Sequence, residues 1–408
     1  ANDFDTQAFI MDLSTRKIQP ITKDFHPTVS PLQWNHGDGC IYFNTDDGDC
    51  KNIYRYSPKD GKFEKLNLET DVTSAFALSE YNPGIAAYIG QSDYNAGVAY
   101  LYDMKKKTSS LLADPMKPIL EKIELGKTEP WNFTASDGTV ITGKMCLPPN
   151  FDPNKKYPMM VNFYERNSET LYNYRMPEPH RSTIDYHLYN SNEYVIFNPD
   201  IRYVDGYPGE SCYNCLMPGI TMMIAKGYIN EKGIGAQGHS WGGYQVAYLA
   251  TRTNLFSAIE SGAPVVNMFS AYGGIRWGSG MARSFQYEHT QSRLGATPWS
   301  SPLRYLENSP LFTMDKVQTP ILIMHNDADG HVPWYQGIEY FVAMKRLGKP
   351  CWLLNYTGEP HWPMHMANRI DFQRRMFQFF NHYLKNQKMP KWMSEGVPAV
   401  EQPFELGY

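Results

Sequence analysis

The chain has 408 residues, of which 20% are charged, and a formal net charge of −4 at neutral pH. This balance gives no basic excess for nucleic-acid binding, and no apolar run approaches the ~18 residues of a membrane span. We therefore expect a globular protein with no nucleic-acid partner and no membrane span. Its length is sufficient for two domains.

The N-terminal part of the chain contains segments that align with one another at a spacing typical of β-propeller blades. They begin at Phe9, Ile53 and Tyr100, so the offsets are 44 residues (53 − 9) and 47 residues (100 − 53). A period of ~40–50 residues with strand–turn–strand content is the signature of such blades, and a closed propeller needs at least ~4 of them. Residues 1–117 therefore predict about two and a half blades. We expect the chain to be the C-terminal part of a longer polypeptide, with a small two-bladed β module as the alternative.

The remaining residues change character and predict an α/β domain. We expect residues 118–135 to form a linker and a first strand, and residues 136–408 to form the domain itself. Apolar strands alternate there with helical segments. The expected strands are residues 159–164, 194–198, 234–238, 258–261, 321–325 and 352–356. This alternation predicts a mainly parallel sheet with helices on both faces.

Residues 238–243 read Gly-His-Ser-Trp-Gly-Gly between an expected strand and an expected helix. This is a G-x-S-x-G nucleophile elbow in the required setting. Glycines flank the serine because the turn is too tight for side chains, and the helix that follows directs its N–H groups at the same point. The motif predicts that Ser240 is a nucleophile. The alternative is a glycine-rich turn with an incidental serine.

A serine of this kind needs a base and an orienting acid, which follow it in the order Asp, His. The loop after the next-to-last strand carries Asp327 and Asp329, and the loop after the last strand carries His361. The imidazole would take the serine proton, and the carboxylate would fix its tautomer. The position just past the final strand favours His361, and the order alone leaves both acids open. The competing bases are His325, His331 and His365.

Three motifs together resemble the prolyl oligopeptidase family of serine peptidases, in particular the branch of dipeptidyl peptidase IV and related bacterial peptidases. They are the elbow, the acid loop His-Asn-Asp-Ala-Asp-Gly-His-Val-Pro at 325–333, and Gly-Glu-Pro-His ending at His361. The family's D-x-x-V pattern selects Asp329, and the family's histidine corresponds to His361. The resemblance implies an α/β-hydrolase domain preceded by a β-propeller, and peptidase activity. Relatives of this branch are commonly exported, which favours a periplasmic or secreted location.

The resemblance also implies an oxyanion hole. The strand 159–164 ends at the position of the family's oxyanion tyrosine, so the hydroxyl of Tyr164 and the backbone N–H of Trp241 would hold the oxyanion. A tyrosine that only packs at a strand end is the alternative. Glu165 and Arg166 follow where relatives often carry small residues. We expect this departure to alter the rim of the hole and hence substrate preference.

The long connection between Pro264 and Pro320 is rich in aromatic residues. In relatives, this region walls an apolar pocket for the residue before the scissile bond, often proline. Residues 266–269, Val-Asn-Met-Phe, stand where dipeptidyl peptidases have an arginine and a tryptophan. The family's pocket residues therefore do not transfer cleanly, and post-proline specificity is a weaker inference than peptidase activity. For any single member, packing in the core is the alternative. The candidate pocket residues are Val265, Met268, Tyr272, Trp277, His331 and Val332.

The six cysteines suggest neither a disulfide nor a metal site. Cys40 and Cys50 flank an expected hairpin in which Cys50 would lie opposite a residue near Thr45, so a bridge between them is not favoured. Cys212 and Cys215 have redox or metal-ligand spacing, but no second pair follows. We expect no metal and no cofactor.

The sequence thus favours a serine peptidase that hydrolyses short peptide substrates through an acyl-enzyme. An esterase or other acyl hydrolase of the same fold is the second interpretation, because the triad does not distinguish esters from amides. A non-catalytic scaffold that binds partners is the third.

Overall fold

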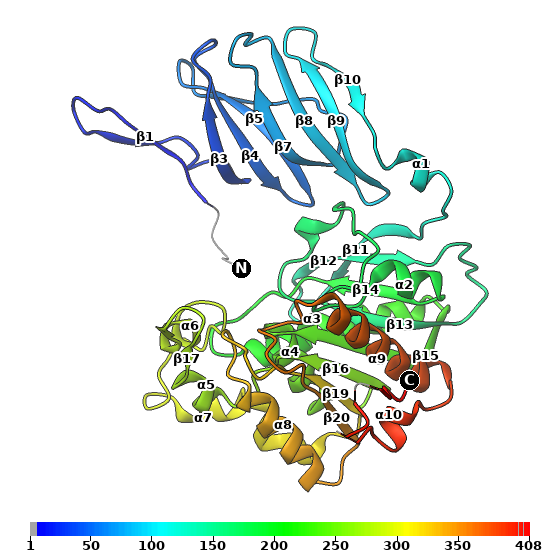
Figure 1. Ribbon diagram of the computed structural model, residues 1–408. Coiled ribbons are helices and arrows are strands. Elements are labelled where there is room, and N and C mark those ends of the chain that lie inside the picture. Colours follow the sequence, from blue (N-terminus) through cyan, green and yellow to red (C-terminus); the bar gives the residue numbers. More distant parts are fainter. Residues whose placement is uncertain (1–5, 399, 403) are drawn as a thin grey trace. The chain divides into compact units, whose positions relative to one another are not determined.

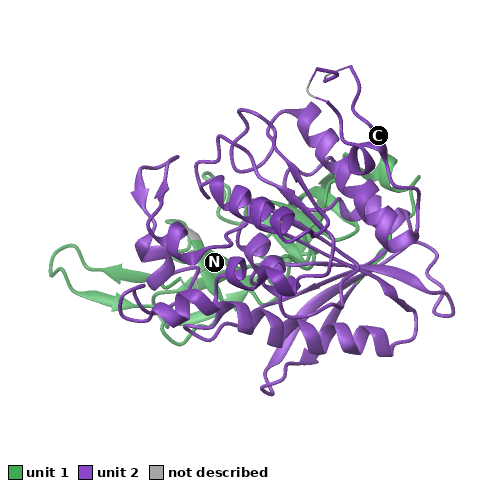
Figure 2. Cartoon of the chain, turned by 90° about the horizontal axis from the view of Figure 1, so that it is seen from below, with its two compact units in different colours: residues 1–128, 168–176 green, residues 129–167, 177–408 purple. Residues whose placement is uncertain are grey.

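The computed structural model describes residues 6–398, 400–402 and 404–408 (Figure 1). The chain divides into two compact units, coloured separately in Figure 2. Unit 1 comprises Ala1–Thr128 and Ser168–Met176, and unit 2 comprises Glu129–Asn167 and Pro177–Tyr408. Residues 1–5, which the expected propeller region includes, lie outside the described residues.

The described part of unit 1 consists mainly of two four-stranded antiparallel meanders. The first contains β3 (Thr28–Trp34), β4 (Ile41–Asp47), β5 (Cys50–Ser57) and β6 (Lys62–Lys65). The second contains β7 (Val72–Leu78), β8 (Ile85–Ser92), β9 (Asn95–Asp103) and β10 (Thr108–Ala113). A parallel pair, Lys51 with Val72, joins the meanders into one sheet, and β1 (Phe9–Met11) and β2 (Ile18–Pro20) form a separate hairpin. Four strands joined in chain order are the content of one propeller blade.

Period-two alternation explains why these segments form strands. In β8, the buried Ala86 and Tyr88 alternate with the more exposed Ile85 and Ile89, because successive side chains of a strand point to opposite faces of the sheet. The buried residues pack into one cluster with those of the neighbouring strands. The short segments α1 (Lys117–Leu120) and η1 (Ser168–Thr170) also belong to unit 1.

The hairpin between β4 and β5 keeps Cys40 and Cys50 apart, as we expected. Cys50 lies opposite Asp47, two residues from Thr45, and the loop contains Gly48 and Asp49. Gly48 adopts a φ of +70°, which suits glycine in a tight turn. All six cysteines are free thiols, including Cys40 and Cys50.

Unit 2 is built around an eight-stranded sheet in the order β11-β12-β14-β13-β15-β16-β19-β20. β12 runs antiparallel to β14, and the strands from β14 to β20 in this order run parallel. Its strands are β11 (Lys127–Thr134), β12 (Val140–Leu147), β13 (Tyr157–Asn162), β14 (Val195–Pro199), β15 (Ile229–His239), β16 (Ala258–Gly262), β19 (Ile321–Met324) and β20 (Cys351–Leu354). The sheet confirms the expected fold, and β13 ends two residues before Tyr164.

Helices cover both faces of this sheet (Figure 1). The helices α3 (Pro208–Ala225), α4 (Trp241–Ala250) and α8 (Tyr335–Arg346) contribute to one hydrophobic cluster, and α2 (Tyr186–Ser191) and α9 (Met366–Lys385) contribute to another. In α9, Phe372, Met376, Phe379 and Phe380 are fully buried, at the spacing of one helix face. No described helix has the length and apolar character needed to cross a membrane.

The connection from β16 to β19 forms a layer of short elements next to the start of α4. It contains α5 (Met268–Tyr272), β17 (Ile275–Arg276), β18 (Met281–Ala282), α6 (Ser284–Glu288), α7 (Pro302–Glu307) and η2 (Pro310–Lys316). Buried residues of α5, α6 and α7 pack in one cluster with Trp241 and Tyr244 of α4. The short helix α10 (Lys391–Ser394) follows α9 near the C-terminus.

Candidate active site

Ser240 lies in a strained turn between the end of β15 and the start of α4. Its backbone has φ 59° and ψ −115°, which a non-glycine residue adopts rarely and at a cost in strain. The turn closes because the flanking glycines leave no room for side chains. A Cβ atom at Gly238 would lie 2.3 Å from the carbonyl oxygen of Gly242, and one at Gly243 would lie 2.3 Å from that of Gly262. The glycine spacing in the sequence therefore has the physical cause that we inferred.

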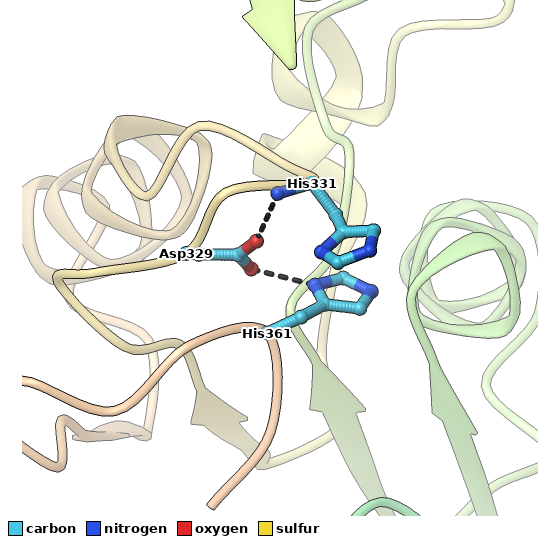
Figure 3. A group of neighbouring side chains, drawn as sticks. All are labelled: Asp329, His331 and His361. Atoms are coloured by element: carbon cyan, nitrogen blue, oxygen red, sulfur yellow. Dashed lines mark hydrogen bonds and ion pairs between the residues drawn. The ribbon is translucent and has the colours of Figure 1, made fainter. Parts of the chain in front are cut away.

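Asp329 and His361 form a buried pair in the loops after β19 and β20 (Figure 3). Nδ1 of His361 lies 2.6 Å from Oδ2 of Asp329. The other carboxylate oxygen, Oδ1, accepts hydrogen bonds from the backbone N–H groups of His331 at 2.8 Å and Val332 at 2.9 Å. A carboxylate can only accept, so Nδ1 carries the proton and Nε2 keeps its lone pair. This is the tautomer that a general base requires.

The carboxyl group of Asp329 stays ionised in this setting. Burial raises its pKa, but hydrogen bonds from His325 and His361 outweigh that effect and hold the pKa well below its usual range. His325 is fully buried, and its Nε2 lies 3.3 Å from Oδ2 of Asp329. A second imidazole therefore contacts the carboxylate of Asp329 and stabilises its charge. The sequence did not suggest this role for His325.

The other candidates occupy different places. Asp327 is exposed and accepts a hydrogen bond from the backbone N–H of Gly358 at 2.7 Å, which connects the two loops. His365 precedes α9, and its Nδ1 lies 2.7 Å from Oε1 of Glu359. Asp329, and not Asp327, contacts the imidazole of His361. The structure thus brings together the acid and the histidine that the family resemblance selects.

His331 stacks against His361, with ring centroids 4.9 Å apart and an interplanar angle of 26°. One ligand atom from each of Asp329, His331 and His361 lies within 4.8 Å of the others (Figure 3), close enough to consider a metal ion. An imidazole binds a metal in the plane of its ring, and two stacked rings cannot share one ion unless one of them rotates. Both oxygens of Asp329 are also engaged. The arrangement therefore fits an acid–base pair with a stacked neighbour better than a preformed metal centre.

Tyr164 follows β13, and Trp241 is the first residue of α4; the sequence predicts both as oxyanion donors. The hydroxyl of Tyr164 accepts a hydrogen bond from Nε2 of Gln291 at 2.8 Å. Burial and the charge of Glu165 raise the pKa of Tyr164, while hydrogen bonds with Gln291 and Ser240 oppose this rise. Trp241 is the first residue of α4, so its backbone N–H belongs to the first turn, whose donors have no intrahelical acceptor.

Glu165, which we expected to alter the rim of the proposed oxyanion hole, is buried. Its Oε1 pairs with Nη1 of Arg293 at 2.9 Å, and both side chains are at most 6% exposed. The pair connects the end of β13 to the β16–β19 connection, beside Tyr164. The sequence carried no signal for Gln291 or Arg293, since neither belongs to a motif.

Two buried titratable side chains lie on neighbouring strands of the sheet, His239 on β15 and Glu260 on β16. His239 is buried with its ring centroid 4.7 Å from that of His361, and among the described residues neither of its ring nitrogens has a hydrogen-bond partner. Burial lowers the pKa of His239 well below its usual range. Glu260, on β16, accepts a hydrogen bond from Nε2 of Gln237 at 2.8 Å, and burial raises the pKa of Glu260 to about 8. Both shifts favour the neutral forms of these groups.

The candidate pocket residues separate into two groups. Val265, Met268 and Val332 are buried in one cluster with Trp241 and Tyr244, and Tyr272 packs against it. Trp277 lies outside this cluster and is 72% exposed, in the turn between β17 and β18. Trp241, the residue after Ser240, belongs to this apolar cluster, so the cluster packs beside the elbow.

Comparison with known proteins agrees with this geometry. The sequence profile described as prolyl oligopeptidase family matches residues 202–387. The chain carries a prolyl oligopeptidase family domain. It is 25% identical over 311 residues to dipeptidyl-peptidase 5 of Porphyromonas endodontalis, covering 70% of this chain and 42% of that protein. It is 24% identical over 404 residues to dipeptidyl-peptidase 5 of Porphyromonas gingivalis, covering 92% of this chain and 55% of that protein. The chain spans about half the length of these curated relatives.

Solved structures of this family share the fold of the chain. Pyrococcus horikoshii acylaminoacyl peptidase superposes with a TM-score of 0.76 at 20% identity, covering 98% of this chain and 61% of that one. Porphyromonas gingivalis dipeptidyl peptidase 4 superposes with a TM-score of 0.74 at 19% identity, covering 92% of this chain and 52% of that one. These likenesses extend over both units, so the α/β-hydrolase fold and the propeller-like portion have counterparts in known structures.

Proposed function

We propose that the family domain is a serine peptidase that hydrolyses short peptides through an acyl-enzyme. The observation that carries the proposal is the strained serine at 240 together with the 2.6 Å pair between His361 and Asp329. In the first step, Oγ of Ser240 attacks the scissile carbonyl carbon while Nε2 of His361 takes its proton. Asp329 holds the tautomer and stabilises the imidazolium.

The negative charge that develops on the carbonyl oxygen needs donors already in place. We assign these to the hydroxyl of Tyr164 and the backbone N–H of Trp241, and one such donor contributes about 2.7–4 kcal/mol to the transition state. The imidazolium then returns its proton to the leaving amine, which departs. Water attacks the acyl-enzyme by the reverse sequence, with His361 again as the base, and releases the carboxylic acid.

Peptides are favoured over simple esters as substrates because the relatives are named as peptidases. Two of them carry the name dipeptidyl-peptidase 5, and a structural neighbour is an acylaminoacyl peptidase. An esterase stays the second candidate, since the same acyl-enzyme chemistry cleaves both bonds. The complete arrangement of nucleophile, base and acid argues against a non-catalytic scaffold.

A fluorophosphonate probe tests the nucleophile directly. We expect stoichiometric labelling of Ser240 in the full chain, loss of labelling in Ser240→Ala, and normal labelling in Ser394→Ala, which removes an exposed hydroxyl on α10. A library of fluorogenic peptides and matched esters then separates the two enzyme classes. Persistent labelling of Ser240→Ala would contradict the assignment, and turnover of esters without peptides would favour the esterase.

A further inference from the structure

We propose that Arg276, with the buried charge of Arg283 behind it, forms a subsite that binds a carboxylate group of the peptide substrate. The inference rests on the proposed peptidase function and specifies the class of peptide. Both residues come from the β16–β19 connection: Arg276 ends β17, and Arg283 directly precedes α6. No motif in the sequence singled them out.

Arg283 contacts the acid loop directly, and the hairpin that carries Arg276 is attached to the same loop through its backbone. Arg283 donates hydrogen bonds to the carbonyl oxygen of His331 and to the hydroxyl of Tyr287, the latter at 2.9 Å. Burial lowers the pKa of His331, and the positive charges of His361, Arg276 and Arg283 lower it further. The charge of Arg276 also acts on the hydroxyl of Tyr164, where it opposes the rise in pKa that burial causes.

Neither positive charge has a counter-ion within the described part of the chain. Arg283 is 1% exposed, and its Nε has no hydrogen-bond partner among the described residues. Arg276 is half-buried, and no acidic side chain of the described ranges pairs with it. Arg293 shows the usual arrangement nearby, because its buried guanidinium pairs with Glu165 at 2.9 Å. Buried charges are normally paired, so the guanidinium of Arg283, which no carboxylate of the described residues neutralises, and the half-buried Arg276 on the neighbouring hairpin indicate that an anionic partner comes with the ligand.

The acidic side chains of the same region are already engaged. Asp329 binds His361 and two backbone N–H groups, and Glu288 accepts the hydroxyl of Tyr272 at 2.6 Å. Neither is thus available to neutralise the arginines. A planar guanidinium binds a carboxylate through two parallel hydrogen bonds, which makes a carboxylate the matching ligand. A peptide can supply it as an acidic side chain or as its C-terminal α-carboxylate.

The hairpin that carries Arg276 is attached to the acid loop. The backbone N–H of Gly278 donates to the carbonyl oxygen of Gly330 at 2.9 Å, one residue from Asp329. A Cβ atom at Gly278 would lie 3.3 Å from that same oxygen, so the two backbones approach closely. The position of the guanidinium groups is therefore coupled to that of the proposed catalytic acid.

Matched substrates test the subsite in the full chain. One arm compares chromogenic dipeptides with Glu or Gln at either position, and the other compares a tripeptide with its C-terminal amide. We expect kcat/KM to be at least about tenfold higher for the carboxylate member in one of the two arms, as a charge-assisted contact provides. Arg276→Gln should bring this ratio close to one. Arg346→Gln, which removes an exposed charge on α8, should keep the ratio.

Calorimetric binding of the same pairs to Ser240→Ala separates this inference from the catalytic proposal. Tighter binding of the carboxylate member, lost in the double variant Ser240→Ala/Arg276→Gln, supports the subsite even if no peptide is turned over. Equal Kd values and equal kcat/KM values in both arms overturn it, as does a ratio that Arg276→Gln leaves unchanged. If the fluorophosphonate probe fails to label Ser240 but the carboxylate member still binds more tightly, the result counts against the proposed function and not against the subsite.

Discussion

Nδ1 of His361 lies 2.6 Å from Oδ2 of Asp329, although 32 residues separate them in the chain. The other carboxylate oxygen, Oδ1, accepts hydrogen bonds from the backbone N–H groups of His331 and Val332, which belong to the same loop as Asp329. The loop therefore orients Asp329, and Asp329 in turn orients the imidazole. A buried, ionised acid in this position leaves Nε2 of His361 as the available base.

The first prediction separates the two acids of the loop. Asp329→Asn should lower kcat by up to about 10⁴-fold, because the amide favours the wrong imidazole tautomer. Asp327→Asn should cost far less, since Asp327 is exposed and bonds the backbone of Gly358. Steady-state kinetics on a short fluorogenic peptide measure both. Comparable losses from the two substitutions would contradict the assignment.

The second prediction concerns the oxyanion hole. Tyr164→Phe removes one proposed donor and should lower kcat about 10²–10³-fold while KM changes little, because the bond to the oxyanion forms only in the transition state. Tyr356→Phe serves as a control for loss of a buried hydroxyl of the same domain, which bonds Asp371. If kcat is unchanged in Tyr164→Phe, the hydroxyl of Tyr164 is not an oxyanion donor and other groups stabilise the oxyanion.

The third prediction tests the glycine requirement of the elbow. Gly238→Ala places a Cβ atom 2.3 Å from the carbonyl oxygen of Gly242, a backbone atom that cannot move without opening the turn. We expect loss of probe labelling and destabilisation by at least about 1–3 kcal/mol, as for overpacked sites. Gly273→Ala is the matched control, because its Cβ would meet no atom closer than 3.9 Å. Chemical denaturation and labelling of both variants provide the comparison.

The fourth prediction follows from the buried carboxyl group of Glu260, whose pKa burial raises to about 8. Between the unfolded pKa of about 4.3 and this value, the native state keeps a proton that the unfolded state releases, so the contribution of Glu260 to stability falls as pH rises. The slope approaches about 1.4 kcal/mol per pH unit. Glu260→Gln should abolish this loss, so its stability relative to the parent chain should rise from pH 5 to pH 8.

Denaturation of the domain at pH 5, 6.5 and 8 measures the effect on Glu260→Gln. Exposed Glu231→Gln on β15 is the control and should show a constant difference from the parent chain across the same range. A stability difference for Glu260→Gln that is independent of pH would mean that Glu260 titrates at the same pH in the folded and unfolded chain.

Local constraints made part of this site readable in the sequence. Gly238 is required by an atom only four residues away, the carbonyl oxygen of Gly242. The strands of the sheet were predicted because their apolar runs reflect burial on both faces. The β4–β5 hairpin was predicted with a residue near Thr45 opposite Cys50, and the length of the loop decides that this residue is Asp47.

Contacts between distant segments were decided by the tertiary structure alone. Asp327 and Asp329 lie in one loop, and spacing cannot say which side chain points at His361; the family resemblance selected one, and loop geometry places it there. Gln291 bonds Tyr164 across 127 residues, and Arg293 pairs with Glu165 across 128. The unpaired Arg276 and Arg283 likewise belong to a connection without a repeating pattern. Ion pairs and their absence depend on which surfaces pack together, and only the folded chain brings those surfaces into contact.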